Sequence, residues 1–555
     1  MSANRKSNSN FLVQGSILAV ASILSRIIGL LYRVPLTAII GNVGNDYYSC
    51  AYEIYSMMLL ISSYSLPLAV SKMVSSRMAL GQKKNAHKVF KGALAIALTT
   101  GTAGCVIVFF AADFLTSVVF KTPMSIFALR VLAPVLIIVA VLGVIRGFFQ
   151  GIGTMVPSAV SQILEQIVNA GVSVGAAFVL FGYGMRIGGV LGSADTYAAA
   201  YGAAGGTLGT AVGAGVALLF LIFIFVLYRP AMRRAERRER KRNGRVREES
   251  YSVIIKMLLL TIVPVLLSTT IYNISSVIDQ GIFKNIANIQ GYDAHTVSVW
   301  WGIFAGKYKV LINVPISIAS AIAASCVPSL AAAFAEKDKS QVRGKINSSM
   351  RFVMIIAFPC MVGFIVLASP ILQLLFHETG ELAERLLQFG AVSIVFYSIS
   401  TLSNGILQGI NRMRIPVRNA LIALGAHIIC LVVLMYGFRL NIYAVVLSTA
   451  FFAFLMCILN GASVQRYSGY RPDVMKTYIK PAAASAVMGV IVFAIYHFGM
   501  MLLPINAIWT VLGILAGILV YAAVIIRIRG LSESDLKSFP KGTVLLKFAK
   551  KFHLL

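Results

Sequence analysis

The sequence predicts an all-α polytopic membrane protein with about fourteen transmembrane helices. They are expected to form two six-helix lobes, related by a pseudo-twofold axis along the membrane normal, plus two C-terminal helices. Composition supports this class, because 58% of the 555 residues are hydrophobic and only 12% are charged. A soluble domain carries about 25% charged residues, roughly twice as many. The mean hydropathy of +0.84 agrees.

Fourteen apolar runs are each long enough to cross about 30 Å of hydrocarbon. Six of them precede a strongly basic segment and eight follow it. The predicted spans are 14–40, 50–76, 88–111, 125–149, 157–182, 198–228, 252–280, 298–330, 350–374, 384–409, 416–437, 441–465, 479–501 and 505–528.

The charges of the connecting loops predict the orientation of these spans. Loops rich in Lys and Arg alternate with short loops that are neutral or acidic, in which the acidic residues are Asp46, Asp195, Asp293, Glu378 and Glu381. Because basic loops stay in the cytoplasm, both termini are expected there. The net charge of +30 therefore reflects topology, and no nucleic-acid partner is expected.

The predicted organisation has five parts. The basic segment between the lobes is interpreted as a solvated, topology-setting connection, with a lipid-headgroup or nucleic-acid patch as the alternative. The parts are an N-terminal lobe (1–228), a cytoplasmic basic linker (229–251), a C-terminal lobe (252–466), two extra transmembrane helices (467–528) and a cytoplasmic basic tail (529–555).

An internal duplication supports the two lobes. The segment RGFFQGIGTMVP at 146–157 recurs as NGILQGINRMRIP at 404–416, and a second, weaker match has nearly the same offset. Each half has an even number of spans, so both enter the membrane from the same side. The repeats are therefore predicted to be parallel, which is an architecture of secondary transporters.

Two arginines in the first span are the leading candidates for a binding site. Arg26 and Arg33 are seven residues apart, close to two helical turns, so both point the same way. An arginine at mid-membrane depth costs about 2.5–3.5 kcal/mol on insertion scales. Guanidinium groups there suit a phosphate-bearing ligand. The alternatives are pairing with carboxylates elsewhere in the bundle, or snorkelling of Arg33.

Other charged residues within the predicted spans are further candidates. Glu165 is expected to balance the arginines or bind a coupling cation, or else to pair with Arg146. Asp279 lies at the end of the seventh predicted span. It is expected either to balance the charge of the arginines or to be an interfacial residue in contact with water. Lys307 and Lys309 are two residues apart, so only one of them is expected to face a cavity.

No enzyme class is favoured by the motifs. There is no P-loop, no HExxH and no G-x-S-x-G, and the six cysteines have no metal-ligand spacing. A transporter without catalytic residues, cofactor or metal is expected.

At the level of motifs, the chain resembles the MOP exporter superfamily. Within it, the chain is most similar to MurJ-type lipid II flippases and to stage V sporulation protein B-like polysaccharide exporters. The segments that carry this resemblance are SRIIGLLYRVPL (25–36), SYSLPLAVSKMVS (63–75), RGFFQGIGTMVPSAVSQILEQIVN (146–169) and ILQGINRMRIPVRNA (406–420).

The resemblance implies a cationic central cavity for a pyrophosphate and sugar headgroup, and a groove for the polyprenyl tail formed with the last two helices. Arg26 occupies the position of a first-helix arginine of that family, and Arg33 lies close to a second one. Where the family carries an arginine in the outer part of the second helix, this chain has Glu53 and Tyr55. We therefore expect Arg26, Arg33, Glu53, Lys307 and Lys309 to bind cargo.

The expected activity is a flippase for undecaprenyl-pyrophosphate-linked saccharides, lipid II above all, working by alternating access in the bacterial cytoplasmic membrane. The alternatives are a cation-coupled multidrug exporter and a flippase for another undecaprenyl-linked polysaccharide unit. Coupling to membrane potential, Na⁺ or H⁺ is left open by the sequence. Membrane lipids are the other expected partners of a monomeric chain.

Overall fold

The computed structural model describes residues 17–18, 20–63, 65–243 and 248–531, and this part of the chain is helical without any strand. It divides into two compact units, with the division after Gly306. The sequence repeat predicts the second lobe to begin at 252. The difference arises because the helices between 251 and 303 pack with elements of the first unit.

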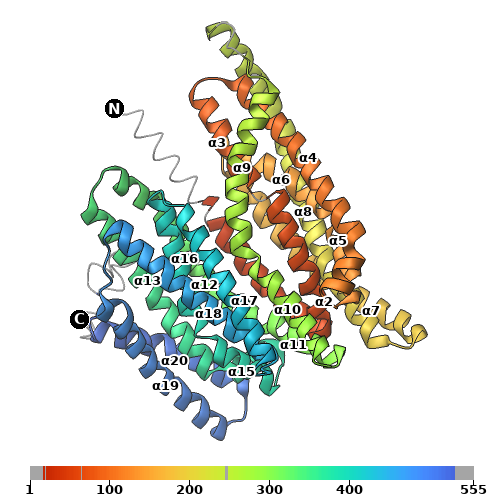
Figure 1. Ribbon diagram of the computed structural model, residues 1–555, viewed down its shortest axis with the longest axis vertical. Helices are drawn as coiled ribbons and strands as arrows, with labels where there is room; N and C mark the ends of the chain where they lie inside the picture. The colour runs from red at the N-terminus through yellow and green to blue at the C-terminus, as the bar shows by residue number, and fades with distance from the viewer. Residues whose placement is uncertain (1–16, 19, 64, 244–247, 532–555) are drawn as a thin grey trace. The chain divides into compact units, whose positions relative to one another are not determined.

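The first unit begins with an apolar helix, Val20–Leu31. Ten α-helices follow it in the described part of the first unit (Figure 1). They are α2 (Arg33–Ser62), α3 (Leu66–Ala79), α4 (Lys83–Asp113), α5 (Ile126–Leu132), α6 (Val135–Gly151), α7 (Val156–Leu191), α8 (Ala194–Asn243), α9 (Tyr251–Asn273), α10 (Ser275–Ile289) and α11 (Ala294–Ile303).

The second unit is built in the same way from long helices with short connections. Its elements are α12 (Lys309–Ala335), α13 (Lys339–Val366), α14 (Ala368–Phe376), α15 (Glu381–Gly390), α16 (Ser393–Gly409), α17 (Arg414–Tyr436), α18 (Ile442–Ser468), α19 (Lys480–Leu502) and α20 (Asn506–Arg527).

The number of spans agrees with the sequence. In the described residues, eleven helices are long and apolar enough to cross a membrane, or twelve if the bent pair α15 and α16 is one span. Two shorter apolar helices, Val20–Leu31 and Tyr251–Val263, lie at the first and seventh predicted spans. Twelve plus two gives the fourteen expected, so the all-α membrane-spanning fold is confirmed.

The connection between the first two spans differs from the predicted loop. The chain turns at Gly41, whose φ of 67° and ψ of −173° interrupt α2, and helix resumes at once. Glycine adopts such a positive φ without steric cost. Residues 42–49 are therefore helical, and Asp46, predicted to lie in an outward loop, is buried inside the unit.

The helices α7 and α8 form a long antiparallel pair that approaches backbone to backbone (Figure 1). Three glycines of α8 are spaced by four residues and face α7. A Cβ on Gly205 would lie 2.5 Å from the Ala176 carbonyl oxygen, and one on Gly213 would lie 2.6 Å from the Glu165 carbonyl oxygen. Small residues at this spacing allow close helix packing in membranes. This close packing fixes the position of the part of α7 that contains Glu165.

Replacing the middle glycine, Gly209, with leucine is expected to separate α7 from α8. Its Cβ would lie 2.6 Å from the Asn169 carbonyl oxygen, so the helices must shift. Overpacking of this kind costs about 1–3 kcal/mol. The measurement is the melting temperature of the purified protein. Gly215→Leu is the control on the same helix, because a Cβ there meets nothing within 4 Å. Equal melting temperatures for both variants would contradict the packing argument.

An ionic cluster holds the start of α9 against the α3–α4 connection. Arg77 donates to the Glu249 carboxylate through Nε at 3.1 Å and Nη2 at 2.6 Å. Lys84 and Lys88 both pair with Glu248, the latter at 2.8 Å. The Asn85 side chain accepts from the Glu249 backbone N–H at 3.1 Å. The last residues before α9 are therefore tied to the first unit by side chains of α3 and α4.

Glu249→Gln is expected to loosen the start of α9 more than Glu248→Gln does. Arg77 is 9% exposed and would lose its charged acceptor, whereas Lys84 is 61% exposed and its pair with Glu248 is screened by water. The measurement is hydrogen exchange of the backbone amides at 251–256. Greater exchange in the Glu248 variant would contradict this ranking.

The same cluster predicts a pH dependence. Hydrogen bonds from Lys84 and Lys88 lower the pKa of Glu248 from about 4.5 to about 2. A folded-state pKa below the unfolded value means that the pairing stabilises the fold above about pH 4.5. That contribution is lost as pH falls toward 2.

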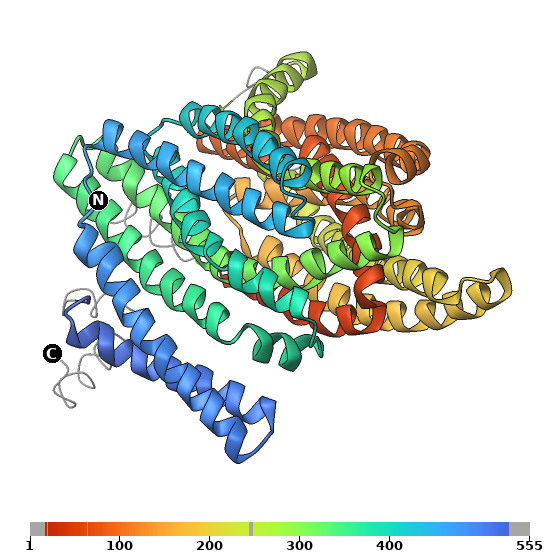
Figure 2. The same ribbon diagram turned by 60° about the horizontal axis from the view of Figure 1, so that its bottom comes forward.

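In the second unit, the last two helices form a pair packed on α13 and α14, and they appear as the dark blue hairpin in Figure 2. Asn506 donates from Nδ2 to the Pro370 carbonyl oxygen at 3.2 Å. Arg351 donates from Nη2 to the Gly530 carbonyl oxygen at 2.9 Å. These bonds tie both ends of α20 to the rest of the unit.

Candidate functional site

A polar cavity of about 370 Å³ lies within the first unit. Its volume falls in the range of 300–1,000 Å³ that is usual for ligand sites. The walls come from the helix before α2 and from α2, α6, α7 and α8. The lining residues are Ser25, Arg26, Gly29, Tyr32, Arg33, Tyr52, Tyr55, Leu59, Val139, Glu165, Gln166, Asn169 and Thr210.

The first helix turns its polar side to this cavity. Arg26, Gly29 and Arg33 line it together, as their seven-residue stripe predicts. Ile23 and Ile27 point elsewhere, with 45% and 48% of their surfaces exposed. Thr37, the next residue of the same helical spacing, is buried and donates to the Asn45 side chain at 3.3 Å. The stripe therefore ends at Arg33.

Tyrosines of α2 hold the guanidinium of Arg33. Its Cζ lies 4.4 Å from the ring centroid of Tyr48 and 5.7 Å from that of Tyr52. The rings of Tyr48 and Tyr52 are stacked at 5.8 Å with 12° between their planes. Cation–π contacts fix the arginine without neutralising its charge. Arg33 is thus oriented by aromatic rings, and its charge remains available to a ligand.

Another part of the wall is supplied by α7 and carries the one acidic lining residue, Glu165. Its carboxylate accepts from Arg146 of α6 at 2.7 Å. Farther along α7, Asn169 donates to the Tyr32 hydroxyl at 3.4 Å and accepts from Ser173 at 2.9 Å. The pairing with Arg146, one of the alternatives predicted for Glu165, is present, and the same carboxylate also lines the cavity.

The lining charges favour an anion. Two guanidiniums face one carboxylate, and that carboxylate already has a cationic partner in Arg146. Guanidinium groups make bidentate, charge-assisted bonds with phosphate. The tyrosine hydroxyls and the amides of Gln166 and Asn169 add neutral donors and acceptors of the kind that hydroxyl-rich groups require. The cavity is chemically suited to a phosphate next to a sugar.

The remaining predicted site residues lie elsewhere. Glu53 of α2 is not among the cavity-lining residues, and its carboxylate accepts from Ser276 of α10 at 2.7 Å. Asp279 is buried in α10, 5% exposed. Lys307 and Lys309 belong to the second unit, where Lys307 is buried and forms an ion pair with Glu378. Their role in cargo binding stays a prediction.

A second buried charge pair links α2 to α10. Lys284 donates to Asp46 at 2.6 Å, and the two side chains are 2% and 0% exposed. Phe283, next to Lys284, stacks on Trp301 of α11 with ring centroids 5.5 Å apart. This pair and the stacked rings fasten α10 and α11 to α2 near the turn at Gly41.

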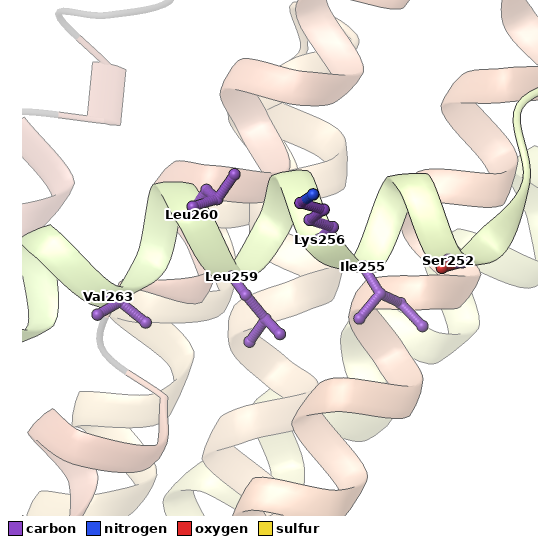
Figure 3. A pocket seen from close by; sticks show the side chains of 6 residues that line it. All are labelled: Ser252, Ile255, Lys256, Leu259, Leu260 and Val263. Atoms are coloured by element: carbon purple, nitrogen blue, oxygen red, sulfur yellow. The ribbon is translucent and has the colours of Figure 1, made fainter.

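An open groove of about 780 Å³ runs along one face of α9 (Figure 3). It is mainly apolar, with one charged residue, Lys256. Its lining has helical spacing and consists of Ser252, Ile255, Lys256, Leu259, Leu260 and Val263. Such a surface suits hydrocarbon, and it cannot solvate a charged headgroup.

In the described part of the chain, no three His, Cys, Asp or Glu side chains lie close enough together to hold a metal ion. The residues that sequence reasoning missed are the cavity tyrosines and amides. A usable signal existed for two of these tyrosines, because Tyr52 and Tyr55 follow helical spacing in α2 with Tyr48, whose ring contacts Arg33. No local signal marks Asn169 or Thr210, which reach the cavity through tertiary packing.

Comparison with known proteins identifies the family. The model for the family described as polysaccharide biosynthesis protein matches residues 12–334. The chain belongs to this family. A second model, MatE, matches residues 309–433. Both matches are those of the MOP superfamily, and the predicted membership in its MurJ and stage V sporulation protein B-like branch is confirmed.

Two relatives from Bacillus subtilis (strain 168) are similar to this chain over most of its length. Lipid II flippase MurJ is 24% identical over 498 residues, covering 87% of this chain and 88% of the relative. Stage V sporulation protein B is 23% identical over 492 residues, covering 88% and 90%. The chain is therefore a multi-pass membrane transporter of the flippase type within the superfamily.

Solved structures agree on the fold. A lipid II flippase MurJ in an inward closed conformation superposes with a TM-score of 0.62 at 16% identity, covering 91% of this chain and 97% of that one. An inward-facing multidrug resistance MATE family transporter also reaches 0.62, at 15% identity, covering 80% and 94%. At these identities the likeness shows the fold alone. It does not indicate the cargo.

Proposed function

We propose that this chain translocates an undecaprenyl-pyrophosphate-linked saccharide across the bacterial cytoplasmic membrane by alternating access, with lipid II as the cargo. The observation that carries the proposal is the cavity in which Arg26 and Arg33 face a single, already paired carboxylate. The similarity to the Bacillus subtilis lipid II flippase supports it.

The physical problem of flipping matches this arrangement. A pyrophosphate-sugar headgroup cannot enter hydrocarbon unaided, because an unpaired charge there costs many kcal/mol. Arg26 and Arg33 supply charge-assisted bonds to the phosphates, while the tyrosines and amides take the place of water around the sugar. The lipid tail stays in contact with apolar surface outside the cavity.

A cation-coupled multidrug exporter is the second candidate, favoured by the MATE fold likeness. Cationic drugs would meet two guanidiniums in the first-unit cavity, and like charges at close range repel. An anionic cargo is therefore the better match to this chain.

The remaining parts of the proposal follow from charge distribution. Both termini lie in the cytoplasm, because the Lys- and Arg-rich loops share one side. Membrane potential contributes about 2.3 kcal/mol per charge per 100 mV and would assist outward movement of an anionic headgroup. Na⁺ or H⁺ exchange is the alternative source of coupling. The protein works as a monomer without cofactor, catalytic residue or nucleic acid.

The proposal is tested by complementation. A bacterial strain depleted of its lipid II flippase is expected to resume growth when this chain is expressed. Membrane insertion is verified by a C-terminal reporter, so that failure of expression is recognised. Well-inserted protein could fail to restore growth and yet restore export of another undecaprenyl-linked polysaccharide. That result would contradict lipid II as the cargo and favour the other polysaccharide unit.

Removing residues 479–555 is expected to abolish translocation of a long polyprenyl lipid while the other twelve spans remain inserted. The duplication is complete without α19 and α20, and a pair added beside it provides surface for a long tail. The truncated protein is checked by size exclusion and assayed for lipid II translocation and drug resistance. Retained lipid II translocation would remove the tail role, and retained drug export alone would favour the exporter.

A further inference from the structure

The basic segment after the sixth predicted span is not a loop. The helix α8 continues through it to Asn243, giving 50 residues and a length of about 75 Å, far more than the hydrocarbon thickness. Sequence reasoning predicted a solvated linker from residue 229. In the described residues, the first part of that linker is a helical extension.

Four arginines of this extension line one hollow of about 390 Å³. Its lining is Val226, Arg229, Pro230, Arg233, Arg234 and Arg237. The arginines are exposed, and helical spacing gathers them on one side of α8. Four guanidiniums around one hollow form a site for an anion.

The same side of α8 is apolar on the membrane side of this hollow. Leu219, Phe223 and Val226 continue the stripe toward the middle of the span, and they are 68%, 60% and 57% exposed. This helix face changes from exposed apolar residues to arginines within one turn. It is therefore suited to a molecule in which acyl chains are joined to a phosphate.

Lys91 of α4 adds a further positive charge close to this surface. His87 lies close enough to Lys91, Arg229 and Arg233 for their charges to act on it. Its Nδ1 is buried and has no hydrogen-bond partner among the described residues. These four groups come from two helices, so the cationic surface does not belong to α8 alone.

The described acidic residues of the linker do not neutralise this surface. Glu248 and Glu249 pair instead with Arg77, Lys84 and Lys88 of the α3–α4 connection. Among the side chains that the structure describes, none of the four α8 arginines has an ion pair.

We propose that the basic extension of α8, residues 226–237, binds the phosphate of an anionic phospholipid whose acyl chains lie along Leu219, Phe223 and Val226. Proteins that only need a topology signal can place arginines anywhere in a loop, whereas here they surround one hollow at the end of an exposed apolar stripe. Such a site anchors α8 to the leaflet on the side predicted to be cytoplasmic, independently of the cargo cavity.

The test uses the full chain in a neutral detergent, titrated with dioctanoyl phosphatidylglycerol and followed by melting temperature. The variant R229Q/R233Q/R234Q/R237Q is expected to weaken this binding at least tenfold. The control R412Q/R414Q/R418Q/R471Q removes the same charge from exposed arginines of the second unit and is expected to stay within twofold of the unchanged chain. If the fourfold variant does not fold, R233Q/R237Q is compared with R414Q/R418Q.

Three outcomes would overturn the proposal. Equal weakening in test and control variants would mean general charge attraction. Equal stabilisation by inorganic pyrophosphate at the same concentration would mean a site for free anions. Displacement of the lipid by a short oligonucleotide at equal charge would mean a nucleic-acid surface.

Discussion

Replacing Arg26 with alanine is expected to abolish translocation while leaving the protein folded and inserted. Arg26 lines the cavity and is exposed in it, so its removal takes a charge from the ligand and little packing from the fold. A hydrogen bond to a charged group contributes about 1.5–3 kcal/mol. At about 1.4 kcal/mol per factor of ten, the affinity for a pyrophosphate lipid should fall roughly 10–100-fold. The measurement is equilibrium binding of the lipid to the purified protein.

The matched control for this prediction is Arg186→Ala, which removes an exposed arginine of α7 that does not line the cavity. It should bind lipid as the unchanged chain does. Arg26→Lys should be impaired as well, because an ammonium keeps the charge but lacks the planar fork. If Arg26→Ala bound the lipid with the affinity of the unchanged chain, the phosphate would not bind in the arginine-lined cavity.

The second large effect is expected at the buried pair Asp46–Lys284. Lys284→Met leaves the Asp46 carboxylate in an interior where it is 0% exposed, and Asp46→Ala strands the ammonium in the same way. Removing one partner of a buried ion pair costs about 3–5 kcal/mol. Either single variant should therefore lower the melting temperature strongly and reduce the yield of folded protein.

The double variant Asp46→Leu/Lys284→Met should recover most of that loss, since an apolar pair of similar volume is often neutral or stabilising. Glu381→Gln serves as the surface control, because its i,i+4 pair with Arg385 is 74% and 55% exposed and contributes little. If the double variant were as unstable as the singles, the ionic interaction would not be the reason for the loss.

The part of the site that could be predicted from sequence is the pair of arginines that lie in one predicted span. The seven-residue spacing of Arg26 and Arg33 places them on one face, and both line the cavity. The number and approximate positions of the spans were also predictable, because hydrocarbon thickness imposes a minimum length on every apolar run.

What could not be predicted depends on contacts between distant segments. Asp46 and Lys284 are 238 residues apart, and nothing local to either residue announces the other. The sequence places Asp46 in a loop because most connections between spans are several residues long. Here the connection is a turn at Gly41 alone, and the helix resumes directly after it. The continuation of α8 through the basic segment was equally hidden, because a run of arginines is compatible with helix and with coil.

The choice between an anionic and a cationic cargo rests on where charges lie. The fold is shared with a lipid II flippase and with a multidrug resistance MATE family transporter, so it cannot decide. Glu165 is the one acidic group of the cavity wall, and Arg146 already binds it at 2.7 Å. The described lining therefore has two guanidiniums and one carboxylate, together with tyrosine and amide groups that suit a sugar.

Translocation by purified protein in vesicles tests the central claim most directly. The chain is reconstituted into proteoliposomes with a fluorescent lipid II, and the headgroup exposed on each leaflet is measured by quenching. The unchanged protein should move lipid II between leaflets, and a variant lacking Arg26 and Arg33 should not. Movement of a lipophilic cationic dye in exchange for Na⁺ or H⁺, with lipid II left in its original leaflet, would contradict the account.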